Sequence, residues 1–135
     1  AFTITTLDEG IRRRFEPRSP SVPERLAALE KLAAEGIKTW IFFGPLLPRL
    51  SDSEEDIGEM FTQAERVGAQ WVLVDRLNLY PEVWDRLEPV LRVHFPGLLE
   101  HYRWIRENPR GYSSTLRKRV EEVAKNHRIR CRVVF

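Results

Sequence analysis

The sequence has 135 residues, of which 42% are hydrophobic and 31% are charged, and its formal net charge is +2. This length and composition are typical of one globular domain, and no apolar run reaches the roughly 20 residues of a membrane-spanning helix. The one cysteine, Cys131, excludes an internal disulfide and a metal site made from cysteines of this chain alone. The three histidines form no zinc motif, so no metal site is expected.

The first part of the chain predicts a strand, a short helical turn and a longer helix. Residues 2–6 are β-branched and aromatic, which favours a strand rather than a secretory leader. The chain opens inside this strand without an initiator methionine, so we expect a fragment of a longer protein. A helical turn over 11–15 and a proline-rich loop follow. Ser21 and Glu24 have capping-box spacing, and Gly36 is placed to end the helix that they begin.

The next segment repeats this order of strand and helix. Residues 39–43 are apolar throughout, which is typical of a parallel strand covered on both faces. Gly44 and Pro45 predict a turn that ends the strand. Ser51 and Glu54 again have capping-box spacing, so they predict the start of a second helix.

The remaining segment is predicted to be mostly helical between two strands. A strand over 70–74 is followed by a helix from Pro81, which Pro89 bends or breaks, and by a helix from Pro96. A turn over 108–111, a helix around Leu116 and Val120, and a half-exposed strand over 129–135 complete the chain. The alternation of strands and helices predicts an α/β fold with right-handed crossovers and a mostly parallel sheet. Four strands make either an open sheet or a sector of a β/α barrel.

We interpret residues 1–135 as one α/β domain, with βα units in 1–105 and a basic terminal helix and strand in 106–135. The terminal segment holds nine Lys and Arg against three Asp and Glu, whereas the rest holds thirteen against seventeen. Such a segment could attract nucleic acid, although solvated faces of a helix and an edge strand explain the same charge. The single cysteine also suggests a reducing compartment, and we expect a cytoplasmic protein that does not contact a membrane.

Three motifs occur in a fixed order between Thr5 and Asp52, and the similarity that they indicate covers about residues 1–100. They are Thr5-Thr6-Leu7-Asp8-Glu9 with Glu16-Pro17-Arg18-Ser19-Pro20, then Ala34-Glu35-Gly36-Ile37, then Gly44-Pro45-Leu46-Leu47-Pro48-Arg49-Leu50-Ser51-Asp52. In this order they resemble the later part of radical S-adenosylmethionine proteins of the spore photoproduct lyase-like group, which is related to DNA repair photolyases.

The resemblance implies a fold and a chemistry for the longer protein. The fold is a partial, TIM-like β/α barrel of which this chain is the C-terminal half. The family binds a [4Fe–4S] cluster through C-x-x-x-C-x-x-C early in the barrel and cleaves S-adenosylmethionine to a 5′-deoxyadenosyl radical, which abstracts hydrogen from a substrate. With one cysteine the present chain cannot hold the cluster. Either an N-terminal barrel half supplies it and this chain alone is inactive, or the chain is not an active member of the family. A lyase activity, on nucleic acid and in DNA repair, is the implied function.

The resemblance also implies which residues contact the cofactor across the strand ends. The hydroxyls of Thr3 and Thr5 would meet ribose or amino-acid oxygens, although a strand favours threonine in any case. The carboxylate of Glu16 would bind a ribose hydroxyl or the ammonium group. Arg14 would pair with the carboxylate of the cofactor. A surface ion cluster explains the last two residues equally well.

The same rim includes the ends of the second and third strands. The backbone of Gly44, Pro45 and Leu46 would read an adenine edge, and apolar side chains would pack on the ring. Asp75, followed by Arg76 and Asn78, would contact adenine or substrate, or would cap the next helix. Among the aromatic residues, the tyrosines could stack on bases, although packing is their default role; they are Tyr80, Tyr102 and Tyr112.

The alternative function is a non-enzymatic α/β module that binds a nucleotide or a partner protein. The two interpretations differ in one physical property. A half barrel exposes a sheet edge where its missing strands would pair, so it predicts self-association of the isolated chain.

Overall fold

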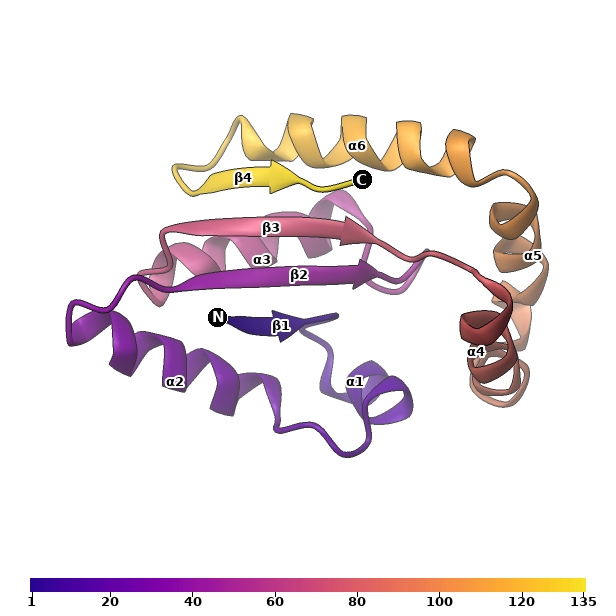
Figure 1. Cartoon of the computed structure of the whole chain (residues 1–135), viewed down its shortest axis with the longest axis horizontal. Coiled ribbons are helices and arrows are strands. Elements are labelled where there is room, and N and C mark those ends of the chain that lie inside the picture. Colours follow the sequence, from indigo (N-terminus) through magenta and orange to yellow (C-terminus); the bar gives the residue numbers. More distant parts are fainter.

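The computed structural model describes residues 1–135 and contains one four-stranded sheet. Its strands are β1 (Phe2–Ile4), β2 (Trp40–Leu46), β3 (Trp71–Arg76) and β4 (Arg130–Val133). They lie in the order β1-β2-β3-β4, and each neighbouring pair is parallel (Figure 1). The predicted α/β class is therefore confirmed, and the sheet is parallel throughout.

Six α-helices and one 3₁₀ turn connect the strands. They are α1 (Glu9–Phe15), α2 (Val22–Ala34), α3 (Glu54–Arg66), α4 (Pro81–His94), η1 (Pro96–Leu98), α5 (Leu99–Glu107) and α6 (Pro109–Ala124). In Figure 1, α2, α3 and α6 run alongside the strands, whereas α4 and α5 lie beyond the arrowheads at the carboxyl edge of the sheet. No helix has both the length and the apolar character that crossing a membrane requires.

The main core lies between one face of the sheet and the three helices that run alongside it. The strand residues of this core alternate along the chain and are fully buried; they include Ile4, Ile41, Phe43, Val72 and Val74. The helical residues of the same cluster come from α2, α3 and α6, apart from Ile105 of α5; they include Leu26, Leu29, Ile57, Phe61, Leu116 and Val120. The apolar side chains that recur every second residue along the strands therefore pack against those that recur about every 3.6 residues along the helices.

The opposite face of the sheet is not covered by a helix of this chain. Trp40, Phe42, Trp71 and Leu73 lie on it and are only half-buried. The expectation that these strands are covered on both faces is therefore wrong for this chain. The physical reason is the strand order, because consecutive right-handed crossovers that all step in one direction place their helices on the same face.

A smaller second core lies at the carboxyl edge of the sheet. It joins α4 and α5 to the segments that follow β2 and β3; its buried residues are Leu47, Leu77, Trp84, Leu87, Leu91 and Tyr102. The Tyr102 hydroxyl donates a hydrogen bond of 2.9 Å to the Pro48 carbonyl. This core therefore fixes the loop after β2, where sequence reasoning expects a ligand site.

Two predicted features of the second βα unit are corrected. Strand β2 does not end in a turn at Gly44, because it continues through a cis Gly44–Pro45 peptide to Leu46, which is paired with Arg76. The register shifts between Phe43 and Leu46, and such an irregularity lets a strand accommodate a proline without a ladder hydrogen bond.

The capping box of α3 is also displaced from its predicted position. It is formed by Ser53 and Asp56 instead of Ser51 and Glu54. The Ser51 hydroxyl instead accepts a hydrogen bond of 2.9 Å from the Leu47 N–H inside the loop, so the helix begins after that loop is complete.

Two predictions about the later helices are corrected in part, because Pro89 does not break its helix and the turn predicted over 108–111 is reduced to the junction at Asn108. Helix α4 continues through Pro89, which is exposed together with Asp85 one turn earlier, so water can solvate the carbonyl that the proline leaves free. The predicted turn over 108–111 is the start of α6, with Asn108 as the N-cap and Pro109 as the first helical residue. A proline suits that position because its fixed φ is already helical.

Candidate functional site

Four of the predicted site residues meet at the carboxyl edge of β1, β2 and β3. The Thr5 hydroxyl donates a hydrogen bond to Oε1 of Glu16 and lies 3.4 Å from the Gly44 carbonyl oxygen. A methyl group added to Gly44 would lie 3.1 Å from both Cβ and the carbonyl oxygen of Asp75. Because these strands are adjacent and parallel, their ends bring Thr5, Glu16, Gly44 and Asp75 together, with Thr5 and Gly44 buried and with Glu16 and Asp75 partly exposed.

Glu16 is held in place by a buried arginine of α2. The Arg25 side chain is 7% exposed, and its Nη2 atom lies 2.8 Å from Oε2 of Glu16. The same guanidinium donates to the Thr3 carbonyl at 2.7 Å and to the Pro20 carbonyl at 3.0 Å. It therefore joins β1, the loop and α2, while Glu16 keeps 21% of its side chain exposed to a ligand.

A second buried arginine fixes the backbone of the same loop. Arg12 donates through Nη1 to the carbonyls of Glu16 and Ser19, at 3.0 and 2.9 Å. Its Nε atom lies 3.0 Å from the Glu9 carboxylate, which also accepts the Val22 N–H at 2.7 Å. The Val22 hydrogen bond lowers the pKa of Glu9, and Arg12 adds to this effect while partial burial opposes it. The loop is thus positioned by charge-assisted hydrogen bonds rather than by its prolines alone.

The other predicted cofactor residues lie outside this cluster. Arg14 donates to the Gly10 carbonyl at 3.3 Å, and its guanidinium carbon lies 5.7 Å from the centre of the Phe95 ring. Leu46 is fully buried in the main core, so only its backbone is near the edge. Thr3 is exposed, and Pro45 is half-buried.

Arg25 and Arg12 are site-forming residues that sequence reasoning missed. A signal exists for Arg25, because it lies three residues after Val22 and four before Leu29, on the apolar face of α2. A charged residue at such a position needs a buried partner. No comparable signal separates Arg12 from the two arginines that follow it.

The loop between β2 and α3 is anchored by helix α6 through a buried carboxylate. Asp52 is 5% exposed, and its Oδ2 atom accepts a hydrogen bond of 2.9 Å from the Tyr112 hydroxyl. Arg119 lies 3.4 Å from the same oxygen and donates to the Asp52 carbonyl at 2.7 Å. Burial, and next the Asp52 charge, raise the pKa of Tyr112 above its usual range, so its hydroxyl stays a donor. The conformation of this loop therefore depends on the terminal helix.

The segment after β3 does not cap the next helix with a side chain. The N-cap of α4 is Tyr80, which makes no side-chain cap. The Asp75 carboxylate instead accepts the N–H of Arg76 at 2.8 Å. The capping role considered for this segment is therefore absent. Tyr102 and Tyr112 are buried packing residues, whereas Tyr80 is 64% exposed.

The donor and acceptor set at the edge suits some groups and not others. The partly exposed Glu16 carboxylate is an acceptor that fits a ribose hydroxyl or an ammonium group, and the buried Thr5 hydroxyl supports it from behind. An iron–sulfur cluster does not fit, because the chain has one cysteine and no three His, Cys, Asp or Glu side chains are grouped to hold a metal.

Comparison with known proteins gives relatives without an assigned function. Uncharacterized proteins of Mycobacterium bovis and Mycobacterium tuberculosis are each 27% identical over 133 residues, which is 96% of this chain and 39% of the relative. An uncharacterized protein of Methanocaldococcus jannaschii is 40% identical over 57 residues, 42% of this chain and 22% of that protein. The chain thus spans about two fifths of the length of its mycobacterial relatives. No protein-family model and no solved structure matches it.

Proposed function

We propose that this chain is the C-terminal part of a radical S-adenosylmethionine enzyme and supplies part of the adenosine and substrate rim. One observation carries the proposal. Four consecutive strands are parallel and lie in sequence order, and the predicted residues Thr5, Glu16, Gly44 and Asp75 converge on their carboxyl edge. Ligands of β/α barrels bind at that edge, and the order of the motifs supports this class of ligand.

The uncovered face of the sheet supports the half-barrel architecture. In a β/α barrel this face points to the interior and each edge strand is paired with a neighbour. Here β1 and β4 are edge strands, and the uncovered face carries Trp40, Phe42, Trp71 and Leu73. The partner in this proposal is the N-terminal barrel half of a longer protein. The match covers only 39% of the mycobacterial relative, so that protein is long enough to contain such a half as well.

The residues of this chain bind and orient the cofactor in this proposal. Glu16, fixed by Arg25 and Thr5, accepts hydrogen bonds from ribose hydroxyls or from the ammonium group. The backbone at Gly44 and Pro45 faces the adenine edge. When bound, S-adenosylmethionine supplies a carbon-centred radical through a cluster held outside this chain. The protein is cytoplasmic in this proposal, because a reducing compartment protects such a cluster.

Nucleic acid is the substrate class that the resemblance favours, and exposed cations of the terminal segment support it. Several basic side chains of residues 106–135 have partners within the chain, because Arg119 binds Asp52 and Lys125 binds Glu122. Others make no ion pair. Arg110, Lys118 and Arg128 are exposed, Arg106 lies over the Trp84 ring, and Arg130 and Arg132 lie on the uncovered face of the sheet beside Trp71 and Leu73. Cations free of internal carboxylates can neutralise phosphates.

Calorimetric titration separates this proposal from a non-enzymatic nucleotide-binding module. S-adenosylmethionine should bind wild type and Gly97→Val, and it should not bind Gly44→Val. A side chain at Gly44 would press on β3, whereas no atom lies within 4 Å of the Cβ position at Gly97. No heat with this cofactor, together with binding of another nucleotide, would favour the module.

Sedimentation tests the half-barrel architecture separately. The isolated chain should self-associate as its concentration rises, because its uncovered face and edge strands have no partner. A clean monomer at every concentration would remove the support for a half barrel.

A further inference from the structure

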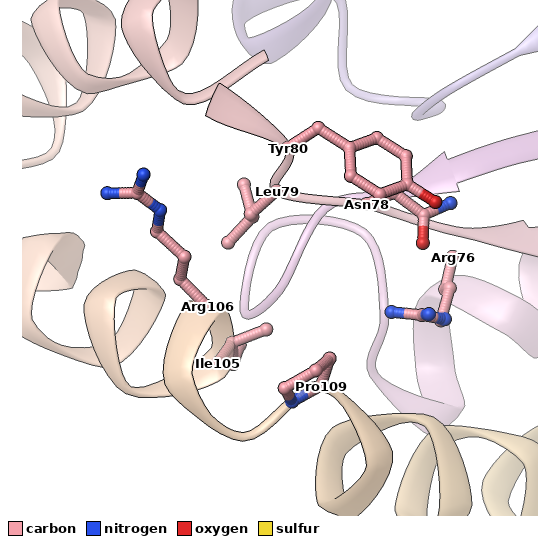
Figure 2. A pocket seen from close by; sticks show the side chains of 7 residues that line it. All are labelled: Arg76, Asn78, Leu79, Tyr80, Ile105, Arg106 and Pro109. Atoms are coloured by element: carbon pink, nitrogen blue, oxygen red, sulfur yellow. The ribbon is translucent and has the colours of Figure 1, made fainter. Parts of the chain in front are cut away.

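A separate pocket lies beyond the carboxyl end of β3, between the segment that leads to α4 and the junction of α5 and α6. Its volume is about 180 Å³, and its lining residues are Arg76, Asn78, Leu79, Tyr80, Ile105, Arg106 and Pro109. Figure 2 shows Leu79, Ile105 and Pro109 between two arginines, with Asn78 and Tyr80 on the Arg76 side. The pocket is therefore apolar in the middle and polar at one end.

The charge of this pocket is positive and is not neutralised by the chain. Arg76 is half-buried, and its guanidinium makes no ion pair or hydrogen bond within the protein, although its own N–H binds Asp75. No acidic side chain lines the pocket. Strand alternation places Asp75 on the opposite face of β3 from Arg76. A half-buried guanidinium without a carboxylate partner is stabilised when it binds an anion.

The second arginine has a different role. The guanidinium carbon of Arg106 lies 5.2 Å from the centre of the Trp84 ring, and Figure 2 shows this guanidinium pointing away from Arg76. Arg106 also lines a second depression together with Trp84, Glu88, Arg103 and Glu107, so acidic side chains lie near it there. Arg76 is therefore the cation that defines the ligand.

We propose that this pocket binds a phosphate group at Arg76, with Asn78 and Tyr80 as neighbours. A guanidinium presents a planar fork of donors that matches two phosphate oxygens, and the Asn78 amide adds a donor. Tyr80 is 64% exposed and offers a flat face to whatever is attached to the phosphate. This site uses Arg76 and Asn78, which follow Asp75 on the β3 rim, but no residue of the Glu16 and Gly44 cluster, so it can be tested without S-adenosylmethionine.

The test measures binding of three probes to the whole chain by calorimetry: inorganic phosphate, adenosine 5′-monophosphate and adenosine. Both phosphate-containing probes should bind wild type, and Arg76→Gln should weaken the binding of both by about tenfold or more. Any binding of adenosine at the Gly44 edge should be the same in wild type and in Arg76→Gln. Lys38→Gln is the control, since it removes an exposed charge just before the amino end of β2 and should bind as wild type does.

Further variants separate the source of the phosphate and guard against misfolding. Arg76→Lys keeps the charge without the fork and should show intermediate affinity, with an unchanged circular dichroism spectrum. If the ligand is a nucleotide, Tyr80→Ala should lower the affinity for adenosine 5′-monophosphate to that for inorganic phosphate. If the ligand is a simple phosphate, Tyr80→Ala should leave both affinities unchanged. The proposal is overturned if wild type binds neither phosphate probe, or if Arg76→Gln and Arg76→Lys bind both as wild type does.

Discussion

Replacement of Arg25 by methionine is the most informative test of how the site is built. The change removes three interactions of the guanidinium, with the Glu16 carboxylate at 2.8 Å and with the Thr3 and Pro20 carbonyls at 2.7 and 3.0 Å. Methionine retains much of the apolar stem, so the loss is mainly that of the charged group. Breaking a buried pair by removing one partner costs about 3–5 kcal/mol. Because Glu16 is 21% exposed and partly solvated, we expect the lower end, ~3 kcal/mol.

Thermal and urea unfolding, followed by circular dichroism, measure this loss. For a chain of this size ~3 kcal/mol corresponds to a fall in Tm of roughly 12 °C. Arg18→Met is the matched control in the same loop, and because Arg18 is exposed and makes no hydrogen bond or ion pair, it should change stability by less than about 0.5 kcal/mol. A double-mutant cycle with Glu16→Gln should give a coupling of roughly 1–3 kcal/mol. A loss similar to that of the control, or no coupling, would refute the assignment of Arg25 as the residue that holds Glu16.

Three further predictions concern stability. Gly44→Ala should destabilise by about 1–3 kcal/mol in urea unfolding, because the new methyl group would lie 3.1 Å from β3, whereas Gly97→Ala should be neutral; equal effects would contradict this. Tyr112→Phe should cost about 2 kcal/mol, because Asp52 loses a buried donor, and an unchanged urea midpoint would refute that role. The lowered pKa of Glu9 stabilises the fold fully above its ordinary value of 4.5, and this contribution disappears as pH falls through the lowered folded-state value. Glu9→Gln should therefore reduce the acid-side slope of stability between pH 3 and 5, roughly the range of carboxyl titration, and an unaltered slope would contradict it.

The features predicted well from the sequence are those with a local cause. The capping box of Ser21 and Glu24 is present, because both partners belong to one helical turn. Gly36 has a positive φ of 77° just after its helix, as predicted for a glycine at a helix end. Strand and helix periodicity also predicted the parallel α/β sheet correctly.

The features that were missed depend on contacts between distant segments. Ser51 and Ser53 offer similar capping signals, and only the loop conformation that binds Ser51 to Leu47 decides between them. The strand could not be predicted to continue through Pro45, because its pairing partner is on β3.

The candidate site shows the same division. The position of Thr5, Glu16, Gly44 and Asp75 at one edge follows from the order of the elements, and it was predicted. The role of Arg25 needs the packing of α2 against β1, which places its guanidinium beside the Thr3 carbonyl. Arg14 could not be separated from its neighbours in sequence, and its contact with Phe95 joins α1 to the end of α4.

The most direct test of the proposed function is formation of 5′-deoxyadenosine by the protein that the complete native reading frame encodes. The proposal predicts a C-x-x-x-C-x-x-C motif upstream of Ala1 and release of 5′-deoxyadenosine from S-adenosylmethionine when the protein is reduced with dithionite. Glu16→Gln should slow this release, and Arg18→Gln should not. A reading frame without the motif, or a reduced protein that releases no 5′-deoxyadenosine, would contradict the account.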